Sequence, residues 1–238
     1  MSLRVSLSIP VIFGLFIIIP GIAGASPSAD ENRLLAEVKQ KFSSITSLAV
    51  QFHMIRRIAD FDEELKSEGI MLYRRGGYLR FQILSPFQSV MLKSPSKIAR
   101  YELVKNKWKT IETKGNRGLE FILGQIESWI SGNFAVDNRL FRVSCRWDTK
   151  GHRDKCLIIT LTPLRAAVKE YIATIDILLQ PRMEGVASIR ILDAQKDTLE
   201  LVFYARQQNI ELADRLFTTI EEPLPATLVP ESTPAPQP

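Results

Sequence analysis

Two cysteines have the spacing of a cross-strand pair. In the segment FRVSCRWDTKGHRDKCLIITL, Cys145 and Cys156 lie symmetrically about Lys150 and Gly151, where a turn is expected. Folded as a hairpin, this segment would place the two thiols opposite each other and within disulfide reach. Closing so short a loop would stabilise the fold by about 3 kcal/mol on the chain-entropy model. A metal site would need further ligands, and two separate thiols are the other alternative, so the pattern favours a structural disulfide.

Groups suited to catalysis or metal binding are sparse in the rest of the chain. The two histidines, His53 and His152, are predicted to lie far apart, which leaves no basis for a Ser-His-Asp triad or a zinc site. The acidic run at residues 60–64 lacks the ligand spacing of a calcium loop and is expected to be a solvated loop. Glycine-rich fingerprints of nucleotide-binding proteins are also missing from the sequence. We therefore expect a protein that is not an enzyme and that uses no metal or cofactor.

One arginine occupies a position that requires a partner. In GIMLYRRGGYLRFQILSP (residues 69–86), two alternating apolar runs flank a Gly-Gly turn, which is typical of a β-hairpin. Arg75 falls on the same alternating side as Met71 and Tyr73. A guanidinium on an apolar face needs hydrogen-bond acceptors, or else it must lie at the rim and reach water. The residues themselves leave these two alternatives open.

The charge of the chain is mildly basic, with a formal net charge of +5 at pH 7. In an exported protein this excess favours anionic lipid headgroups or an acidic partner, and no nucleic acid is expected. A basic stretch is expected on the outward face of edge strands, where lysine blocks unwanted pairing, and an anionic docking surface is the alternative. The stretch consists of Lys93, Lys97, Arg100, Lys105, Lys107 and Lys109.

Three parts of the chain differ in composition. Residues 1–25 have the layout of a secretory signal peptide, with one cation, an apolar stretch too short to span a membrane, and small residues that indicate cleavage after Ala25. Residues 26–220 are long enough for one domain with a sizeable core. Residues 221–238 are proline-rich with little to bury, and they are expected to form a disordered tail. The mature protein is therefore predicted to be soluble and periplasmic.

The elements that must position these residues are mostly strands. An amphipathic helix is predicted over residues 28–45, where Ser28 and Glu31 have the pattern of a capping box. A second helical segment is predicted over residues 118–131. Strand-like runs recur at spacings of about 8–12 residues, which is typical of an all-β fold. They lie at residues 46–57, in the hairpin 69–86, and at 90–93, 98–104, 108–113, 140–145, 156–161, 171–179, 186–192 and 198–204.

Short connections between these runs predict one antiparallel, meander-like sheet. A twisted sheet of about ten strands must close or curl, because its long edges would otherwise remain exposed. Its inner face would carry an apolar set that packs on the helices: Phe52, Met54, Met71, Leu79, Phe81 and Phe203. The same residues would line a filled core or an open cavity, so the pattern alone does not separate the two.

Several motifs together resemble the periplasmic outer-membrane lipoprotein carriers, the LolA family. They are the leader, the helix-to-strand segment LLAEVKQKFSSITSLAVQF, the hairpin described above, and a C-terminal series: LIITLTPL, ATIDILL, ILDAQKDTLELVF and NIELADRLF. The resemblance spans roughly residues 30–220. It implies a mainly β fold (α+β): an incomplete antiparallel β-barrel of about ten or eleven strands, with two or three helices over its concave side. It also implies a monomer that shields the acyl chains of a lipoprotein or related lipid between an inner-membrane transporter and an outer-membrane acceptor.

The resemblance also assigns roles to particular residues. Arg75 would act as a lid latch, binding backbone carbonyls of the lid helices in the empty carrier and yielding when a lipid enters. The cavity wall would combine the six inner-face residues with Leu123, Ile126 and Trp129 from the lid. The alternative is a non-catalytic periplasmic interaction or lipid-sensing domain with a filled core, which would bind a protein partner.

Overall fold

The computed structural model describes residues 28–60, 63–111, 125–134, 140–148, 155–220 and 224. The predicted signal peptide lies outside the described residues, and so does the predicted tail apart from Leu224. Within the part of the chain that is described, no helix is long and apolar enough to cross a membrane.

The protein is built on one eleven-stranded antiparallel sheet with the strand order β6-β5-β4-β3-β2-β1-β11-β10-β9-β8-β7. The predicted fold class is therefore confirmed, and the strands begin within a few residues of their expected positions. Their bounds are β1 (Ser47–Arg57), β2 (Glu64–Arg74), β3 (Tyr78–Ser85), β4 (Ser89–Ser94), β5 (Lys97–Val104), β6 (Lys107–Ile111), β7 (Phe141–Asp148), β8 (Cys156–Pro163), β9 (Ile172–Leu179), β10 (Val186–Asp193) and β11 (Thr198–Gln208).

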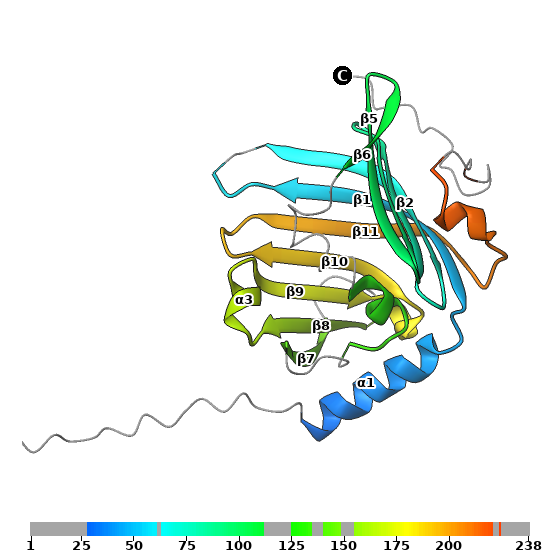
Figure 1. Cartoon of the computed structure of the whole chain (residues 1–238). Helices are drawn as coiled ribbons and strands as arrows, with labels where there is room; N and C mark the ends of the chain where they lie inside the picture. The colour runs from blue at the N-terminus through cyan, green and yellow to red at the C-terminus, as the bar shows by residue number, and fades with distance from the viewer. Residues whose placement is uncertain are drawn as a thin grey trace, which may run out of the picture.

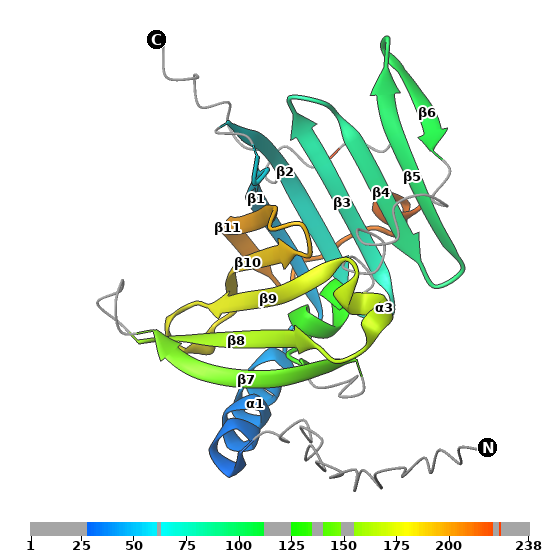
Figure 2. The same ribbon diagram turned by 90° about the vertical axis from the view of Figure 1, so that its left-hand side faces the viewer.

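The sheet curls but does not close. The strands β1–β6 form one meander and β7–β11 another, and the pairing of β1 with β11 joins them. The edge strands β6 and β7 do not pair with each other. Figure 2 shows β3–β6 and β7–β9 curving toward the same side, with a short helical segment at residues 125–130 between them. Curling lets a wide, twisted sheet surround its own apolar face.

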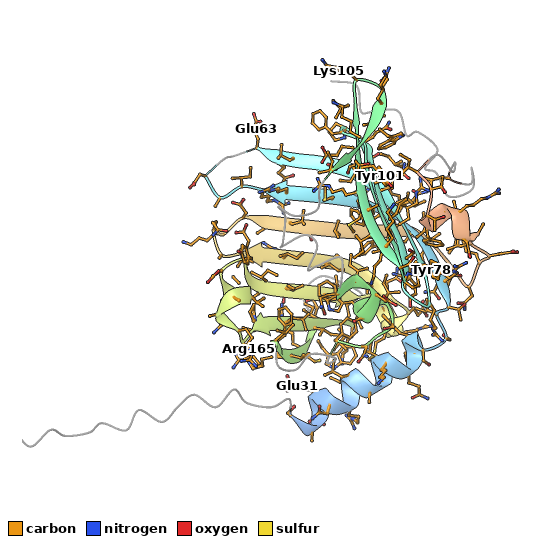
Figure 3. All side chains as sticks on the ribbon, viewed as in Figure 1. Glu31, Glu63, Tyr78, Tyr101, Lys105 and Arg165 are labelled. Carbon is orange, nitrogen blue, oxygen red and sulfur yellow. The ribbon has the colours of Figure 1, made fainter. Side chains whose placement is uncertain are left out.

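Helix α1 (Ala29–Phe42) lies across one end of the sheet (Figure 1). It ends three residues before the predicted boundary, and its predicted capping box is present: Ser28 Oγ accepts from the Glu31 N–H, and the Glu31 carboxylate accepts from the Ser28 N–H at 2.7 Å. The same carboxylate accepts the backbone N–H of Cys145 at 3.0 Å, which ties the start of α1 to the edge strand β7. Figure 3 shows Glu31 at this end of the helix.

Each face of the sheet carries its own apolar cluster. The concave cluster joins inward-facing residues of both meanders to the buried face of α1 and to residues 126–134. The convex cluster is smaller: Ala49, Ile70 and Leu72 of the sheet pack against Leu212, Leu216 and Phe217. Because strand residues alternate between faces, the first six residues of β1 are all buried. Ala49, on the convex face, is therefore buried as well as its concave neighbours Leu48 and Val50.

The convex cluster is covered by residues 209–220, which we call the strap. It contains the short 3-10 helix η2 (Asp214–Phe217) and lies outside the curl, on the opposite side of the sheet from residues 125–130 (Figure 1). Tyr78, labelled in Figure 3, packs against Phe217 in this region. Two further short helices occur in connections between strands, α3 (Ala166–Lys169) and η1 (Pro181–Met183).

The predicted disulfide is wrong, because Cys145 and Cys156 are not bonded to each other. The register of β7 with β8 places Cys145 opposite Ile159, and Cys156 opposite Asp148. The two cysteines are thus three residues out of step. Since an odd offset puts side chains on opposite faces of a sheet, one thiol points to the concave side and the other to the convex side.

Candidate functional site

The concave face encloses an apolar cavity beneath α1 and residues 125–130. Its volume is about 20 Å³, which is room for about one water molecule. Among the described residues, this part of the interior is therefore nearly filled. The lining combines apolar residues from six elements with one cation: Phe42, Ile45, Leu48, Val50, Met71, Ile126, Trp129, Ile130, Gly185, Val186, Ile189, Phe203 and Arg206.

Most of the residues predicted for the cavity wall are brought together in the concave cluster. Phe52, Met71, Leu79, Phe81, Phe203, Ile126 and Trp129 are buried there. Met54 is partly buried at its margin, and Leu123 lies outside the described residues. Four of these residues line the small cavity itself: Met71, Phe203, Ile126 and Trp129. Whether they contact a lipid stays a prediction.

The floor of the concave face is a tightly packed aromatic group. The ring of Phe52 stacks on Phe81 with centroids 4.5 Å apart, and Phe203 meets it edge-on at 6.5 Å. Gly69 lies opposite Phe52 in the neighbouring strand. A Cβ at Gly69 would come within 2.3 Å of the Phe52 ring, so glycine makes the room for this stack. The floor is thus a preformed apolar surface.

Residues 125–134, which we call the lid, cover this surface. Residues 125–130 are helical, and Gly132 at φ +73° ends the helix with hydrogen bonds from Gly132 N–H to Trp129 O and from Asn133 N–H to Ser128 O. Gly132 also packs closely on Phe42 of α1. The lid is joined to the sheet by an ion pair between Lys93 Nζ and Glu127 Oε2 at 2.9 Å.

The same ion pair corrects the interpretation of the basic stretch. Lys93 lies opposite Leu79 in the β3–β4 register and faces the concave side, whereas an outward position was predicted. Arg100 lies opposite Met91 on the same face and donates to Glu102 at 2.6 Å. The other four cations of the stretch are exposed.

Arg75 combines features of both alternatives. It lies just beyond β2 and is exposed, and its Nη2 donates to the backbone carbonyls of Ser43 at 2.5 Å and Ile45 at 2.9 Å. Ser43 is the C-cap of α1, whose last carbonyls have no partners within the helix. The guanidinium therefore joins the β2–β3 turn to the end of α1, and not to the lid. Its action as a latch stays a prediction.

The phenol of Tyr73 is influenced both by Arg75 and by Glu127 of the lid. Burial raises the pKa of Tyr73, the Glu127 carboxylate adds to the rise, and Arg75 acts in the opposite direction. Tyr73 is only 2% exposed. Its neutral phenol therefore lies between the cation of the turn and the anion of the lid.

Arg206 is a cavity residue that the sequence pattern did not reveal. In β11, Leu201 and Phe203 face inward, so strict alternation would turn residue 206 outward. The β1–β11 register shifts between the Ala49–Gln207 and Gln51–Tyr204 pairs, and Ala205 has φ +47°. Such a bulge re-aims the following side chain. No sequence signal distinguishes this bulge from an ordinary strand.

Potential metal ligands do not gather in the described residues: no group of three or more His, Cys, Asp or Glu side chains could hold an ion there. His53 is exposed, stacks on Tyr204 and lies 3.6 Å from Glu68. His152 lies outside the described residues.

The architecture defines the chain as an open antiparallel sheet curled round an apolar interior that helical segments close. Neither a protein-family model nor a curated protein sequence matches it. Among solved structures it is similar to a DUF1329 family protein from Desulfovibrio piger, with a TM-score of 0.48 and 8% identity over 81% of this chain and 98% of that one.

Two further solved structures are similar in the same way. The lipoprotein LppX from Mycobacterium tuberculosis gives a TM-score of 0.44 and 11% identity over 77% of this chain and 100% of that one. A LolA superfamily protein from Nitrosomonas europaea gives 0.39 and 11% over 79% and 96%. The structural neighbours thus include the superfamily that the sequence resembles. Since these likenesses are distant, the function proposed below rests on the geometry of this chain.

Proposed function

We propose that this protein is a lipid carrier that shields acyl chains against its concave face. The observation that supports the proposal is an apolar face, tightly packed at its floor and covered by a short lid that, among the described residues, makes a single ion pair with the sheet. The predicted signal peptide would place the carrier in the periplasm. There it would move an acylated lipoprotein, or a related lipid, from an inner-membrane donor to an outer-membrane acceptor.

The small cavity requires the lid to move. A space of about 20 Å³ cannot hold an acyl chain, so the lipid must displace residues of the lid or of α1. Each methylene group removed from water contributes about 0.8 kcal/mol. A longer acyl chain therefore offsets more of the loss of the lid's own contacts than a shorter one does. This balance keeps the apolar face covered when the carrier is empty.

Lipid binding can be tested on the mature protein purified from its host. Organic extraction followed by mass spectrometry is expected to recover acyl lipid. The delipidated protein is expected to enhance the fluorescence of the apolar dye N-phenyl-1-naphthylamine, and an acyl lipid is expected to displace the dye. A protein that neither carries lipid nor takes up the dye would refute the proposed carrier function.

A pair of neighbouring substitutions locates the binding. Ile189 lines the cavity, whereas Ser188 precedes it on the other face of β10. Ile189→Trp is expected to abolish dye uptake, because the indole fills the space under the lid, and Ser188→Trp is expected to leave it unchanged. Equal uptake by both variants would place the dye elsewhere.

A second candidate function is a non-catalytic interaction or lipid-sensing domain that binds a protein partner. The observation that favours it is the nearly filled interior, since a packed core needs no ligand. One measurement separates the two candidates. If the lipid-free protein is as stable as the protein purified from its host, and acyl lipids change no dye fluorescence, the result supports the interaction domain.

A further inference from the structure

Arg206 lies at the mouth of the cavity with an incompletely satisfied guanidinium. Nη1 donates to the carbonyl of Glu184 at 3.2 Å and Nη2 to the carbonyl of Val186. The Nε–H is buried and makes no hydrogen bond within the described part of the chain. Because an unmade hydrogen bond at a buried, charged donor is costly, this arrangement resembles a recognition site more than a structural clamp.

The positive charge of Arg206 is also uncompensated. In the residues that the structure describes, no carboxylate lies within 4.0 Å of this guanidinium. Its two acceptors are neutral carbonyls, and the side chains around it in the cavity are apolar. Burial accordingly lowers the pKa of Arg206, although an arginine stays charged. A partly buried cation with no anionic partner is stabilised by an anion that comes from outside.

The fold makes room for this guanidinium. The bulge at Ala205 turns the side chain of Arg206 inward. Gly185 lies directly beneath the guanidinium, because a Cβ at this glycine would come within 1.2 Å of Arg206 Nη1. The position of the cation therefore depends on a bulge in β11 and on a glycine in the β9–β10 connection.

An open hollow of about 490 Å³ adjoins the cavity at the same end of the sheet. It shares Ile45 with the cavity, and it is lined by Lys41, Arg182 and Gln208 together with Met183 and Glu184. Lys41 pairs with Glu37 at 3.6 Å and donates to the carbonyl of Arg182. The hollow beside the apolar cavity thus contains two cationic side chains, Lys41 and Arg182, and one carboxylate, Glu184.

We propose that Arg206 binds the anionic headgroup, a carboxylate or a phosphate, of a lipid whose acyl chain lies along the cavity lining. This inference rests on the proposed lipid-carrier function and adds the orientation and headgroup class of the ligand. The headgroup would lie between α1 and the β9–β10 connection, and the chain would pass Val50 and Ile189 toward Phe203. Guanidinium groups suit this role because they form paired, charge-assisted hydrogen bonds with carboxylates and phosphates.

The test compares two probes that differ only in headgroup charge. The fluorescent fatty acid cis-parinaric acid and its methyl ester are titrated into the delipidated mature protein. The acid is expected to bind at least about tenfold more tightly, because a hydrogen bond to an ionised partner is roughly twice as strong as a neutral one. Displacement by dodecyl phosphate or by laurate then separates phosphate from carboxylate recognition.

Three variants test whether Arg206 causes the preference for the acid over the methyl ester. Arg206→Gln is expected to lower affinity for the acid to that for the ester, while affinity for the ester stays within about twofold. Arg33→Gln, an equal loss of charge at an exposed position of α1, is expected to keep the preference. Gly185→Ala retains the charge but displaces it, and is expected to weaken only binding of the acid.

The outcomes separate the two proposals. Equal binding of acid and ester by the wild-type protein would overturn the headgroup site and leave the carrier intact. Failure of both probes to bind would refute the carrier itself. Equal losses for both probes in Arg206→Gln would show a purely structural arginine, and this result would also overturn the headgroup site. If Arg206→Gln does not fold, the headgroup site is tested by two other measurements: the binding of acid against ester by the wild-type protein, and the binding of the acid by Gly185→Ala.

Discussion

The strap and the lid both cover apolar surface of the sheet, but different contacts hold them in place. Each is a short segment that covers an apolar patch of the sheet, the strap on the convex face and the lid on the concave face. Of the two arginines that hold the strap, Arg80 is fully buried, whereas the lid is held by a partly exposed ion pair. The difference indicates which cover is permanent and which can open.

The strap is anchored by two arginines of the β2–β3 hairpin. Arg80 is 1% exposed and donates to the carbonyls of Leu216 at 3.1 Å and Thr219 at 3.4 Å. Arg74 donates to the carbonyl of Leu212 and to Asp214, and its guanidinium lies 4.1 Å from the Tyr78 ring centroid. Lifting the strap would deprive the buried Arg80 of two carbonyl acceptors and leave it with Gln82, and losing acceptors at a buried charged group costs about 1–3 kcal/mol.

The lid has no comparable anchor among the described residues. Its Glu127 pairs with Lys93, and these side chains are 32% and 23% exposed. Arg75, which joins the sheet to α1 beside the lid, is exposed. When such contacts break, water replaces the lost partner, so the penalty is about 1 kcal/mol or less. The concave cover is therefore the one that a ligand can displace.

Replacing Arg80 should give the largest effect on stability. We expect Arg80→Met to lower the free energy of unfolding by about 3 kcal/mol, because the carbonyls of Leu216 and Thr219 lose their donor and the strap loosens. Urea denaturation measures this loss. Arg142→Met, at an exposed position of β7, should change stability by no more than about 0.5 kcal/mol. A loss of less than about 1 kcal/mol in Arg80→Met would contradict a permanent strap.

Replacing Arg75 should affect transfer more than stability. Arg75→Leu removes the hydrogen bonds to Ser43 and Ile45 that the empty form makes, so the loaded form becomes relatively more stable. We expect lipid uptake to be retained and release to acceptor vesicles to be about fivefold slower, which corresponds to roughly 1 kcal/mol. Vesicle transfer of a fluorescent lipid measures this rate. Transfer at the wild-type rate would dismiss the latch.

A milder change to the lid should speed its opening. Glu127→Gln removes the charge that pairs with Lys93, and we expect dye uptake to become about two- to threefold faster, because a partly exposed pair contributes at most about 1 kcal/mol. Stopped-flow fluorescence measures the rate. Glu64→Gln breaks an ion pair of the same type, at 2.6 Å to Arg57 and away from the lid, and it should leave uptake unchanged. Equal acceleration in both variants would show a general loosening.

The smallest effect concerns Cys145 in the edge strand β7, which packs against the concave cluster. Burial raises the pKa of the Cys145 thiol from an ordinary value of 9.0 to about 12, and Glu31 adds to the rise. A raised pKa gives stability that is complete below about pH 9 and is lost as the pH rises through about 12. Cys145→Ala should therefore reduce the alkaline loss of stability in this window, as followed by circular dichroism.

The same thiol gives a chemical readout. At pH 8 Cys145 should resist iodoacetamide in the folded protein, because the thiolate is the reactive form. The unfolded protein should take up two labels per chain without reduction, since no disulfide joins the cysteines. Rapid labelling of the folded protein would contradict the raised pKa.

Most of the fold could be predicted because local sequence patterns determine where its helices and strands begin and which side of each strand is buried. The capping box at Ser28 and Glu31 marks the start of α1, and alternation identifies the inner-face residues Phe52, Met71 and Phe81. Short connections dictate the antiparallel meander. These features depend on a few neighbouring residues, so tertiary contacts do not change them.

The cysteines show where local patterns fail. Symmetry about Lys150 and Gly151 predicted that Cys145 and Cys156 face each other, but the observed register pairs Cys145 with Ile159. A register is set by which residues the whole sheet buries: Val143, Leu157, Ile159 and Leu161 all enter the concave cluster. Burying this apolar face outweighs a turn that only looks symmetrical.

By itself, the sequence determined where most strands lie along the chain, where the first helix begins and which residues form the apolar side of the sheet, because hydrophobic periodicity reflects burial. Only the tertiary structure decided that the strap covers the convex face, that Arg80 anchors it, and that a bulge at Ala205 turns Arg206 into the cavity. These outcomes depend on pairs of segments far apart in the chain, and a one-residue change in strand phase reverses the face on which a side chain lies.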